Sequence, residues 1–515
     1  MAGLNIDTSK IQPHEGFQGI MSEGRDNTRR WSEYQTSIFA FVESGRGNAI
    51  VEAVAGSGKS TTIIEAMKLV QGSSIFLAFN KSIADELKAK GVNARTFHSL
   101  CFGAVLRATG AQNPDPDKLK KILREAKADG SISEYDHKVY GSFAMKLVGL
   151  ARQVGMGFLT PESFEAWMDI CIHHDIEPDT DGADIGKGIE IARDLLQWSN
   201  QDSRIDFDDM LYIAVRDRVN LPKFDFVFVD EAQDTNMIQR EILRMIMRPG
   251  ARMVAVGDPS QAIYGFRGAD ARSLKLIASE FGAVTLPLSI SYRCSKAVVD
   301  YARQWVSHIE AAPNAADGEV NSLGTDWSPD DFSPNDLVVC RKTAPLISLA
   351  FKCIRFNVPA QVMGRDIGQG LKFLISKMNA RTIDDLVVKL EAYKEREVKK
   401  AVKDENDRLV EQICDKVDSL LFLINALKED RRNFQGLEAG IDYLFKDKAN
   451  AVKLATIHKA KGLEADTVWW LNRSECPSRW ARQPWQQQEE IHLCYVAATR
   501  AKTLLNLIED RAPTE

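Results

Sequence analysis

The chain has 515 residues, of which 44% are hydrophobic and 27% charged, and its formal net charge is −6. At roughly 100–200 residues per domain, this globular composition predicts about three or four domains. The acidic balance excludes a strongly basic coat for nucleic acid, but it does not exclude a local basic groove, because phosphate contacts need only a few well-placed Lys and Arg side chains.

The eight cysteines are scattered, with no CxxC pair, as in proteins of a reducing compartment. No apolar run reaches the ~18 residues of a membrane-spanning helix, and the N-terminus lacks the apolar core of a signal peptide. We therefore expect a cytoplasmic protein with no membrane partner. Cys171 lies near His173 and His174, but no second ligand pair follows at zinc-site spacing, so we expect these side chains to be structural.

Residues 1–28 are polar and are expected to form a flexible tail. Short β-rich runs then alternate with loops and helical segments, beginning with "NAIVEAVA" and "SSIFLAFN" and continuing with "FDFVFVDEAQD" and "RMVAVGDPSQ". This alternation predicts a parallel α/β core, formed by 29–102 and 201–283, with functional side chains at the carboxyl ends of its strands. Residues 103–200 have a mainly helical pattern broken by Pro, Asp and Gly, which predicts an insertion in this core.

A second series of β-rich runs begins at residue 284 with "AVTLPLSISYR" and resumes with "AVKLATIHKAKG" and "DTVWWLN". It predicts a second parallel α/β core, formed by 284–369 and 448–515. Residues 370–447 carry dense charge with apolar residues at helical spacing, which is typical of exposed helices. The expected fold class is therefore α/β, with two parallel-sheet cores that each carry a mainly helical insertion.

The first β-rich run leads into "AVAGSGKST", which fits the phosphate-binding loop pattern G-x-x-x-x-G-K-[ST] except that Ala53 replaces the first Gly. Small residues allow backbone N–H groups to turn toward phosphate oxygens, Lys59 would reach the β- and γ-phosphates, and Ser60 would ligate Mg²⁺. A methyl group at position 53 need not touch phosphate. The nucleotide-binding residues predicted in this loop are Ala55, Gly56, Ser57, Gly58, Lys59, Ser60 and Thr61.

The apolar run "FVFV" ends in Asp230 and Glu231. A carboxylate at the end of such a strand can hold Mg²⁺, and a second one beside it can polarise the attacking water. Taken alone, the pair could also be an acidic turn at the end of a strand, but together with a phosphate-binding loop it predicts nucleotide hydrolysis. We therefore expect Ser60 and Asp230 to be Mg²⁺ ligands, and Lys59 and Glu231 to be catalytic.

Further motifs follow in order along the chain: "YQTSIF", "LAFNKSIADEL", "TFHSL", "IDFDDML", "VDEAQD", "VGDPSQAIYGFRGA", "SISYRCS", "TIHKAKGLEAD" and "YVAATRAK". Each is weak alone, but the ordered set resembles the UvrD/Rep/PcrA type of superfamily 1 DNA helicases across nearly the whole chain. The compact form is similar to the F-box DNA helicase branch and to small phage and bacterial relatives, although no F-box is apparent. The resemblance implies two RecA-like motor domains that use ATP and Mg²⁺, in the cytoplasm of a bacterial or phage-infected cell.

The resemblance also implies roles around the nucleotide. Gln261 would sense the γ-phosphate, Arg293 would reach it, and Arg500 would act as an arginine finger that stabilises charge on the transferring phosphoryl group. Lys59 and Glu231 belong to one core and the two arginines to the other, so only closure of the cleft would assemble the site. The further ATP-binding residues that the resemblance implies, at the adenine and ribose, are Gln35, Tyr292, Gly462 and Glu464.

The DNA-binding residues that the resemblance implies are Phe79, Asn80, Thr96, His98, Phe207, Tyr264, Phe266, Arg267, Thr456, His458 and Lys459. The aromatic rings would stack on bases of any sequence, and the hydroxyl, His and Lys side chains would grip the backbone. The alternative for each ring is burial in a core. Stacking is favoured for Tyr264 and Phe266, which lie in a polar loop, and less so for Phe79 in its apolar run. For Phe207 the two alternatives are balanced.

The function implied is that of an ATP-dependent single-stranded DNA translocase and 3′→5′ helicase. It would act as a monomer on single strands and single-strand/duplex junctions, with proteins of replication, repair or recombination as partners. A second hypothesis, motivated by the short second insertion, is a DNA-stimulated ATPase that displaces or remodels protein–DNA complexes with little unwinding. A third is a P-loop kinase or GTPase without a DNA role, against which the paired aromatics after Gln261 and the two widely separated arginines argue.

Overall fold

The computed structural model describes residues 30–111, 113–174, 176–178, 180, 183–265, 272–403 and 407–509. The expected tail at 1–28 and the predicted DNA-binding residues Phe266 and Arg267 lie outside these ranges. Within the described part of the chain, no helix combines the length and the apolar character needed to cross a bilayer.

Six parallel strands form the first sheet, in the order β3-β2-β4-β5-β1-β6. They are β1 (Ala49–Ala53), β2 (Ser74–Leu77), β3 (Ala94–Arg95), β4 (Phe224–Val229), β5 (Met247–Gly257) and β6 (Val284–Leu288). Successive side chains of a strand face opposite sides of the sheet, so Ile50 and Val51 enter different hydrophobic clusters. One face is covered by α1 (Glu33–Ser44), α2 (Lys59–Met67) and α3 (Lys81–Ala89), and the other by α10 (Met237–Ile246) and α11 (Ser273–Phe281).

Strand β6 corrects one expected boundary. The sequence pattern assigns residues 284–288 to the second core, but β6 pairs with β1 from Ala49↔Val284 to Ala53↔Leu288 and forms an edge of the first sheet. Helix α11 leads into β6, which pairs with β1. The sequence of an apolar strand does not indicate which sheet the strand will join. The chain leaves the first sheet only after β6, where β7 (Ile290–Ser291) pairs with β8 (Glu310–Ala311).

Between β3 and β4 the chain is helical. The helices are α4 (Phe97–Thr109), α5 (Lys118–Ala128), α6 (Glu134–Gln153), α7 (Phe164–His174), α8 (Ile185–Gln201) and α9 (Asp209–Arg216). Their apolar faces belong to the same hydrophobic cluster as one face of the first sheet, and this cluster includes Leu147 and Leu195 of the helices and Leu77 and Val229 of the strands, all fully buried. These helices are therefore joined to the first core by continuous packing.

The second sheet is also parallel, in the order β11-β12-β10-β13-β14-β9. Its strands are β9 (Glu319–Gly324), β10 (Leu337–Cys340), β11 (Ala360–Val362), β12 (Val452–Thr456), β13 (Ala465–Leu471) and β14 (Ala501–Ile508). The helices around it are α12 (Lys296–Ala302), α13 (Ala344–Arg355), α18 (Ile457–Ala460) and α19 (Pro484–Ala498). Between β11 and β12 lie α14 (Arg365–Met378), α15 (Ile383–Lys403), α16 (Asp407–Ala426) and α17 (Phe434–Phe445), which share a hydrophobic cluster with this sheet.

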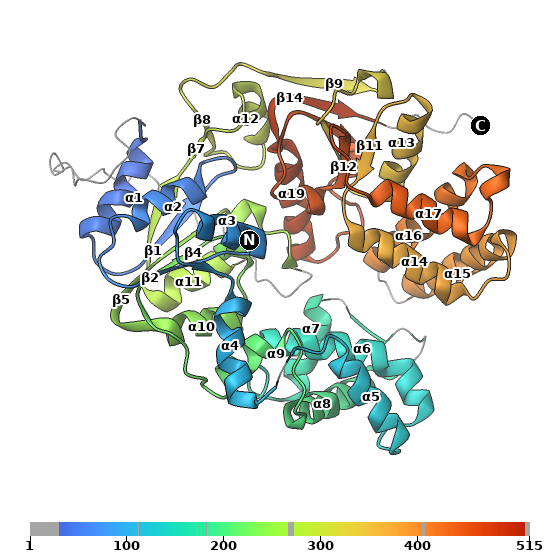
Figure 1. The fold of residues 1–515 in the computed structure, drawn as a ribbon, viewed down its shortest axis with the longest axis horizontal. Coiled ribbons are helices and arrows are strands. Elements are labelled where there is room, and N and C mark those ends of the chain that lie inside the picture. The colour runs from blue at the N-terminus through green and yellow to red at the C-terminus, as the bar shows by residue number, and fades with distance from the viewer. Residues whose placement is uncertain are drawn as a thin grey trace.

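The two parallel sheets with helices on their faces confirm the expected α/β fold class with two RecA-like cores. Helix α19 of the second core lies between the two sheets (Figure 1). Its buried residues share a cluster with Val54, Ala55 and Ile263 of the first core. The loop after β1 therefore packs directly against the second core.

Candidate nucleotide cleft and nucleic-acid groove

The loop between β1 and α2 depends on two glycines. Gly56 and Gly58 have φ angles of +72° and +76°, in the left-handed region that residues with a Cβ atom rarely adopt. A Cβ on Gly56 would lie 2.5 Å from the Cβ of Arg293, and the Tyr292 N–H donates to the Gly56 carbonyl at 2.9 Å. Glycine at position 56 thus lets the segment after β7 approach the loop closely.

Strand β4 delivers two carboxylates to the same edge of the first sheet. Glu231 has a φ of +48°, which is unusual and strained for a residue with a side chain. The Lys59 ammonium lies 3.3 Å from its carboxylate and the Lys461 ammonium 3.8 Å. Burial alone would raise the pKa of Glu231, but these two positive charges hold it below its usual range. Glu231 is therefore ionised at neutral pH, with its carboxylate held by the two lysines.

The neighbouring carboxylate has the opposite electrostatic environment. Asp230 is buried, and its burial together with the negative charge of Glu231 raises its pKa above the usual range. A divalent cation would supply the positive charge that this carboxylate lacks, and Ser60 and Asp230 offer the hard oxygen ligands that Mg²⁺ prefers. The residues present therefore fit an Mg²⁺ ion.

The second core brings two arginines to the cleft. Arg500 follows α19, is 1% exposed, and donates to the Val496 carbonyl at 2.9 Å and to the Gln261 Oε1 atom at 3.5 Å. Burial and the charge of Arg293 lower the pKa of Arg500 to about 10. Arg293 forms an ion pair with Glu464 at 2.7 Å. Because the acceptors of Arg500 are neutral, an anion in the cleft would complement its charge.

A cavity of about 330 Å³ collects most of the predicted nucleotide site from both cores. Its lining includes the predicted nucleotide residues Gly56, Ser57, Gly58, Lys59, Ser60, Thr61, Glu231, Gln261, Arg293, Gly462 and Arg500. Gln35 and Tyr292 do not line it but lie together, with the Tyr292 hydroxyl 3.4 Å from the Gln35 Oε1 atom, while the Gln35 amide donates to Thr62 at 2.9 Å. Glu464 is held by Arg293 and by Lys502 at 3.0 Å.

Ala55 differs from its expected role. Its side chain is buried behind the loop, and its N–H donates to the hydroxyl of Tyr495, 440 residues away, at 2.9 Å. This N–H is therefore turned toward the second core and does not face the cavity. The Tyr495 contact is a link between the cores that the sequence pattern did not reveal, because nothing local marks one tyrosine of "YVAATRAK" as the partner of a backbone amide.

Lys461 is a second residue that the sequence analysis missed. Its ammonium lies 2.7 Å from Asp234 and donates to the Gln261 carbonyl at 2.8 Å. It also lies 4.8 Å from the centre of the Tyr264 ring, close enough for a cation–π contact. Lys461 thus touches both the carboxylate cluster of the cleft and the first ring of the neighbouring groove. The second lysine of the "HKAKG" segment is the sequence feature that could have identified Lys461.

A groove of about 610 Å³ lies beside the cleft and is lined by several predicted DNA-binding residues. Phe79 and Tyr264 stack on each other, with ring centroids 5.8 Å apart and planes 11° apart. His98 and Phe207 form a second pair at 5.0 Å. Phe79 and Phe207 are 43% and 62% exposed, so neither is a core residue. The burial alternative is wrong for both rings.

The other predicted DNA-binding residues lie elsewhere. Asn80, Thr96 and Thr456 each accept a hydrogen bond at the N-terminus of a helix, namely α3, α4 and α18. None of these three, nor Lys459, is part of the groove lining. His458 lines a separate small cavity with Arg341 and Trp480. The structure therefore brings together Phe79, His98, Phe207 and Tyr264, but not the second-core residues expected beside them.

The two histidines near Cys171 contact an aromatic ring. His173 stacks on Trp485 of α19 with ring centroids 5.5 Å apart, and His174 lies 6.5 Å from the same ring. Among the described residues, no group of three or more metal-ligating side chains is found. The pair thus joins α7 to the second core.

Comparison with known proteins supports the same division of the chain. Residues 34–282 match the family model of the UvrD/REP helicase N-terminal domain, and residues 366–511 match that of the UvrD-like helicase C-terminal domain. A probable DNA helicase II homolog of Mycoplasma pneumoniae is 27% identical over 318 residues, which cover 55% of this chain and 43% of that protein. ATP-dependent DNA helicase PcrA of Staphylococcus epidermidis is 22% identical over 302 residues, 52% of this chain and 39% of that protein.

F-box DNA helicase 1 of Gallus gallus is 27% identical over 274 residues, 49% of this chain and 25% of that protein. The chain thus spans less than half the length of these relatives. Two family models are matched in order: the first covers β1 to β5 with the phosphate-binding loop, and the second covers β12 to β14 with α18 and α19. The chain therefore belongs to the UvrD/Rep/PcrA family of superfamily 1 helicases.

Proposed function

We propose that this protein is an ATP-dependent DNA translocase and helicase that moves 3′→5′ along a single strand. The observation that carries the proposal is one cavity lined by Lys59 and Glu231 of the first core and by Arg293 and Arg500 of the second. A site divided in this way is complete only when the cores are close together, so nucleotide binding and core movement are coupled.

Each side chain has a distinct task in hydrolysis. Lys59 and Arg500 would bind the phosphates and stabilise the charge that develops on the transferring phosphoryl group. Glu231, kept ionised by its lysine neighbours, would take the proton of the attacking water. Gln261 would orient that water through its amide. Mg²⁺, held by Ser60 and Asp230, would supply charge neutralisation at the phosphate oxygens.

The cleft reaches the groove by a short path. Gln261 lies within reach of Arg500, and three residues later Tyr264 stacks on Phe79 in the groove. Lys461 bonds to the Gln261 carbonyl and faces the Tyr264 ring. A change at the γ-phosphate would therefore shift the ring that grips a base.

The proposed substrate is single-stranded DNA with its junctions to duplex. Exposed rings bind single strands by stacking, at about 1–3 kcal/mol per base, without reading sequence. The protein would act as a cytoplasmic monomer, alongside proteins of replication, repair or recombination. Polarity and unwinding rest on family membership, and the printed names of the relatives are those of DNA helicases.

The test is unwinding of duplexes with a 3′ or a 5′ single-stranded tail, with and without ATP. We expect strand separation of the 3′-tailed duplex only, and separation of the 5′-tailed duplex alone would contradict the polarity. Hydrolysis stimulated by single-stranded DNA, with displacement of a bound protein but no strand separation, would favour a remodelling ATPase. A hydrolysis rate that does not respond to single-stranded DNA would favour a kinase or GTPase without a DNA role.

A further inference from the structure

The segment that carries Phe207 is held by buried charges. Asp206 and Asp209 bond to each other's backbone, with each N–H donating to the other carboxylate at 2.9 Å. The Arg152 guanidinium of α6 donates to both oxygens of Asp206, at 3.0 and 2.8 Å, and lies 3.0 Å from Asp209. The Arg152 side chain is 1% exposed, so these contacts are shielded from solvent.

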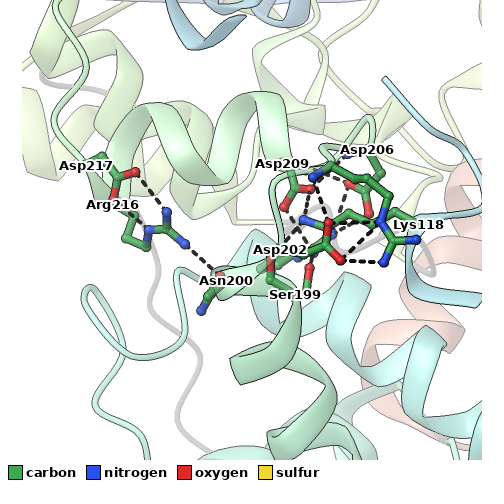
Figure 2. A network of polar contacts seen from close by, with 10 residues as sticks. Lys118, Ser199, Asn200, Asp202, Asp206, Asp209, Arg216 and Asp217 are labelled. Atoms are coloured by element: carbon green, nitrogen blue, oxygen red, sulfur yellow. Dashed lines mark hydrogen bonds and ion pairs between the residues drawn. The ribbon is translucent and has the colours of Figure 1, made fainter. Parts of the chain in front are cut away.

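Two more helices of the insertion reach the same point. The Lys118 ammonium of α5 donates to Asp209 at 2.6 Å and to the Ser199 carbonyl at 2.9 Å, and the Ser199 hydroxyl of α8 accepts from Arg152 at 2.5 Å. Figure 2 shows Lys118, Ser199, Asp206 and Asp209 gathered in one cluster, with Asn200, Arg216 and Asp217 apart from it. Three insertion helices thus converge on the four residues from 206 to 209.

Phe207 lies between the two anchored carboxylates in the chain, but unlike them its side chain is exposed. It is 62% exposed, lies against His98 and lines the groove. A buried charge is costly unless it is paired in good geometry, so the cluster strongly favours one backbone conformation at positions 206–209. A ring on a fixed backbone loses little conformational freedom when a ligand stacks on it.

We propose that Arg152 and Lys118 are positioning residues that hold Phe207 ready to stack on a base of single-stranded nucleic acid. The inference rests on the proposed function, because it takes the groove to be the path of the strand. Arg152 belongs to the groove lining but is 1% exposed, and Lys118 is fully buried, so both cations act on the ring through Asp206 and Asp209. The alternative is a clamp that only joins the helical insertion to the first core.

A double-mutant cycle separates these roles, because two residues that act through one another have non-additive effects. Arg152→Lys keeps the charge but loses the two-pronged contact with Asp206. The affinity for a fluorescent oligo(dT) is measured for wild type, Arg152→Lys, Phe207→Ala and the double variant, with thermal unfolding of each. We expect Phe207→Ala to weaken binding about 5- to 150-fold, and Arg152→Lys about two- to tenfold.

The decisive comparison is made in the Phe207→Ala background. There, Arg152→Lys should weaken binding by less than about twofold, because the ring through which it acts is gone. An equal loss in both backgrounds would overturn the inference, since a structural clamp or a direct phosphate contact acts without the ring. Wild-type binding with no effect of Phe207→Ala would also overturn it, whereas no binding by wild type would refute the proposed function itself.

Two further variants keep the test interpretable. If Arg152→Lys does not fold, Ser199→Ala replaces it in the same cycle, because this change removes a single acceptor of Arg152. The expected loss of affinity is smaller. A loss that disappears in the Phe207→Ala background would again support the inference, and an equal loss in both backgrounds would again overturn it. The matched control is Arg240→Lys. Arg240 is a buried arginine of α10 that pairs with Glu280 at 3.2 Å, outside the groove lining. Arg240→Lys should leave oligo(dT) affinity unchanged, and a loss equal to that of Arg152→Lys would count against the inference.

Discussion

The nucleotide cleft and the groove use charge in opposite ways. In the cleft, Lys59 and Arg500 face the cavity from two different cores. At the groove, Arg152 belongs to the lining but is only 1% exposed, Lys118 is fully buried, and the ring of Phe207 is 62% exposed. A triphosphate is bound through its charge, which requires cations in contact with it. A base is bound through its flat face, which requires a ring held still. Substitution of a cation should therefore have its largest effect in the cleft, and substitution of an aromatic ring should have its largest effect in the groove.

The largest effect should come from removing a cation that faces the cleft. Arg500→Ala should lower the rate of ATP hydrolysis about 10³-fold or more, because an arginine at the transferring phosphoryl group contributes about 10³–10⁵ in rate. Steady-state hydrolysis measures this, with circular dichroism to verify folding. A loss of less than tenfold would mean that the second core does not complete the site.

The next effect concerns the proton acceptor. Glu231→Gln should lower hydrolysis about 10²- to 10⁴-fold and leave ATP binding nearly intact, because the phosphate contacts of Lys59 and the loop remain. Binding of a fluorescent ATP analogue measures the second part. Glu280→Gln, a change in a carboxylate that pairs with Arg240 and Arg244, is the control and should change neither quantity. Normal hydrolysis by Glu231→Gln would refute its assignment.

A half-buried ring of the groove, that of Tyr264, should show a smaller and different effect. Tyr264→Ala should weaken single-stranded DNA binding about 5- to 150-fold, with a smaller change in hydrolysis measured without DNA. Tyr135 is 64% exposed on α6, away from the groove lining, and Tyr135→Ala should leave DNA affinity unaltered. If Tyr264→Ala instead lowered basal hydrolysis as much as DNA affinity, the separation of cleft and groove would fail.

The smallest expected effect is on stability. Tyr495→Phe removes the acceptor of the buried Ala55 N–H, and an unpaired buried donor costs about 1–3 kcal/mol. The urea midpoint of unfolding should therefore fall relative to wild type. Tyr135→Phe, at an exposed site, should leave it unchanged. Equal midpoints for wild type and Tyr495→Phe would show that the link between α19 and the phosphate-binding loop contributes nothing.

The sequence predicted the features that local patterns encode. Short local motifs contain Gly58, Lys59 and Glu231, and the residue types in these motifs indicate phosphate binding and hydrolysis. The alternation of strands and helices indicated two parallel sheets. Contacts between residues far apart in the sequence have no such local pattern. Lys461 reaches Asp234 from 227 residues away, and an apolar strand does not show which sheet it will join, which is why β6 was assigned to the wrong core.

The most direct test of the account is the rate of ATP hydrolysis by the intact chain as single-stranded DNA is added. The cleft and the groove are linked through Gln261, Lys461 and Tyr264, so occupation of the groove should raise the rate until it saturates. The account predicts that Tyr264→Ala shifts this saturation to higher DNA concentration. A rate that is the same with and without single-stranded DNA would contradict the coupling of the two sites.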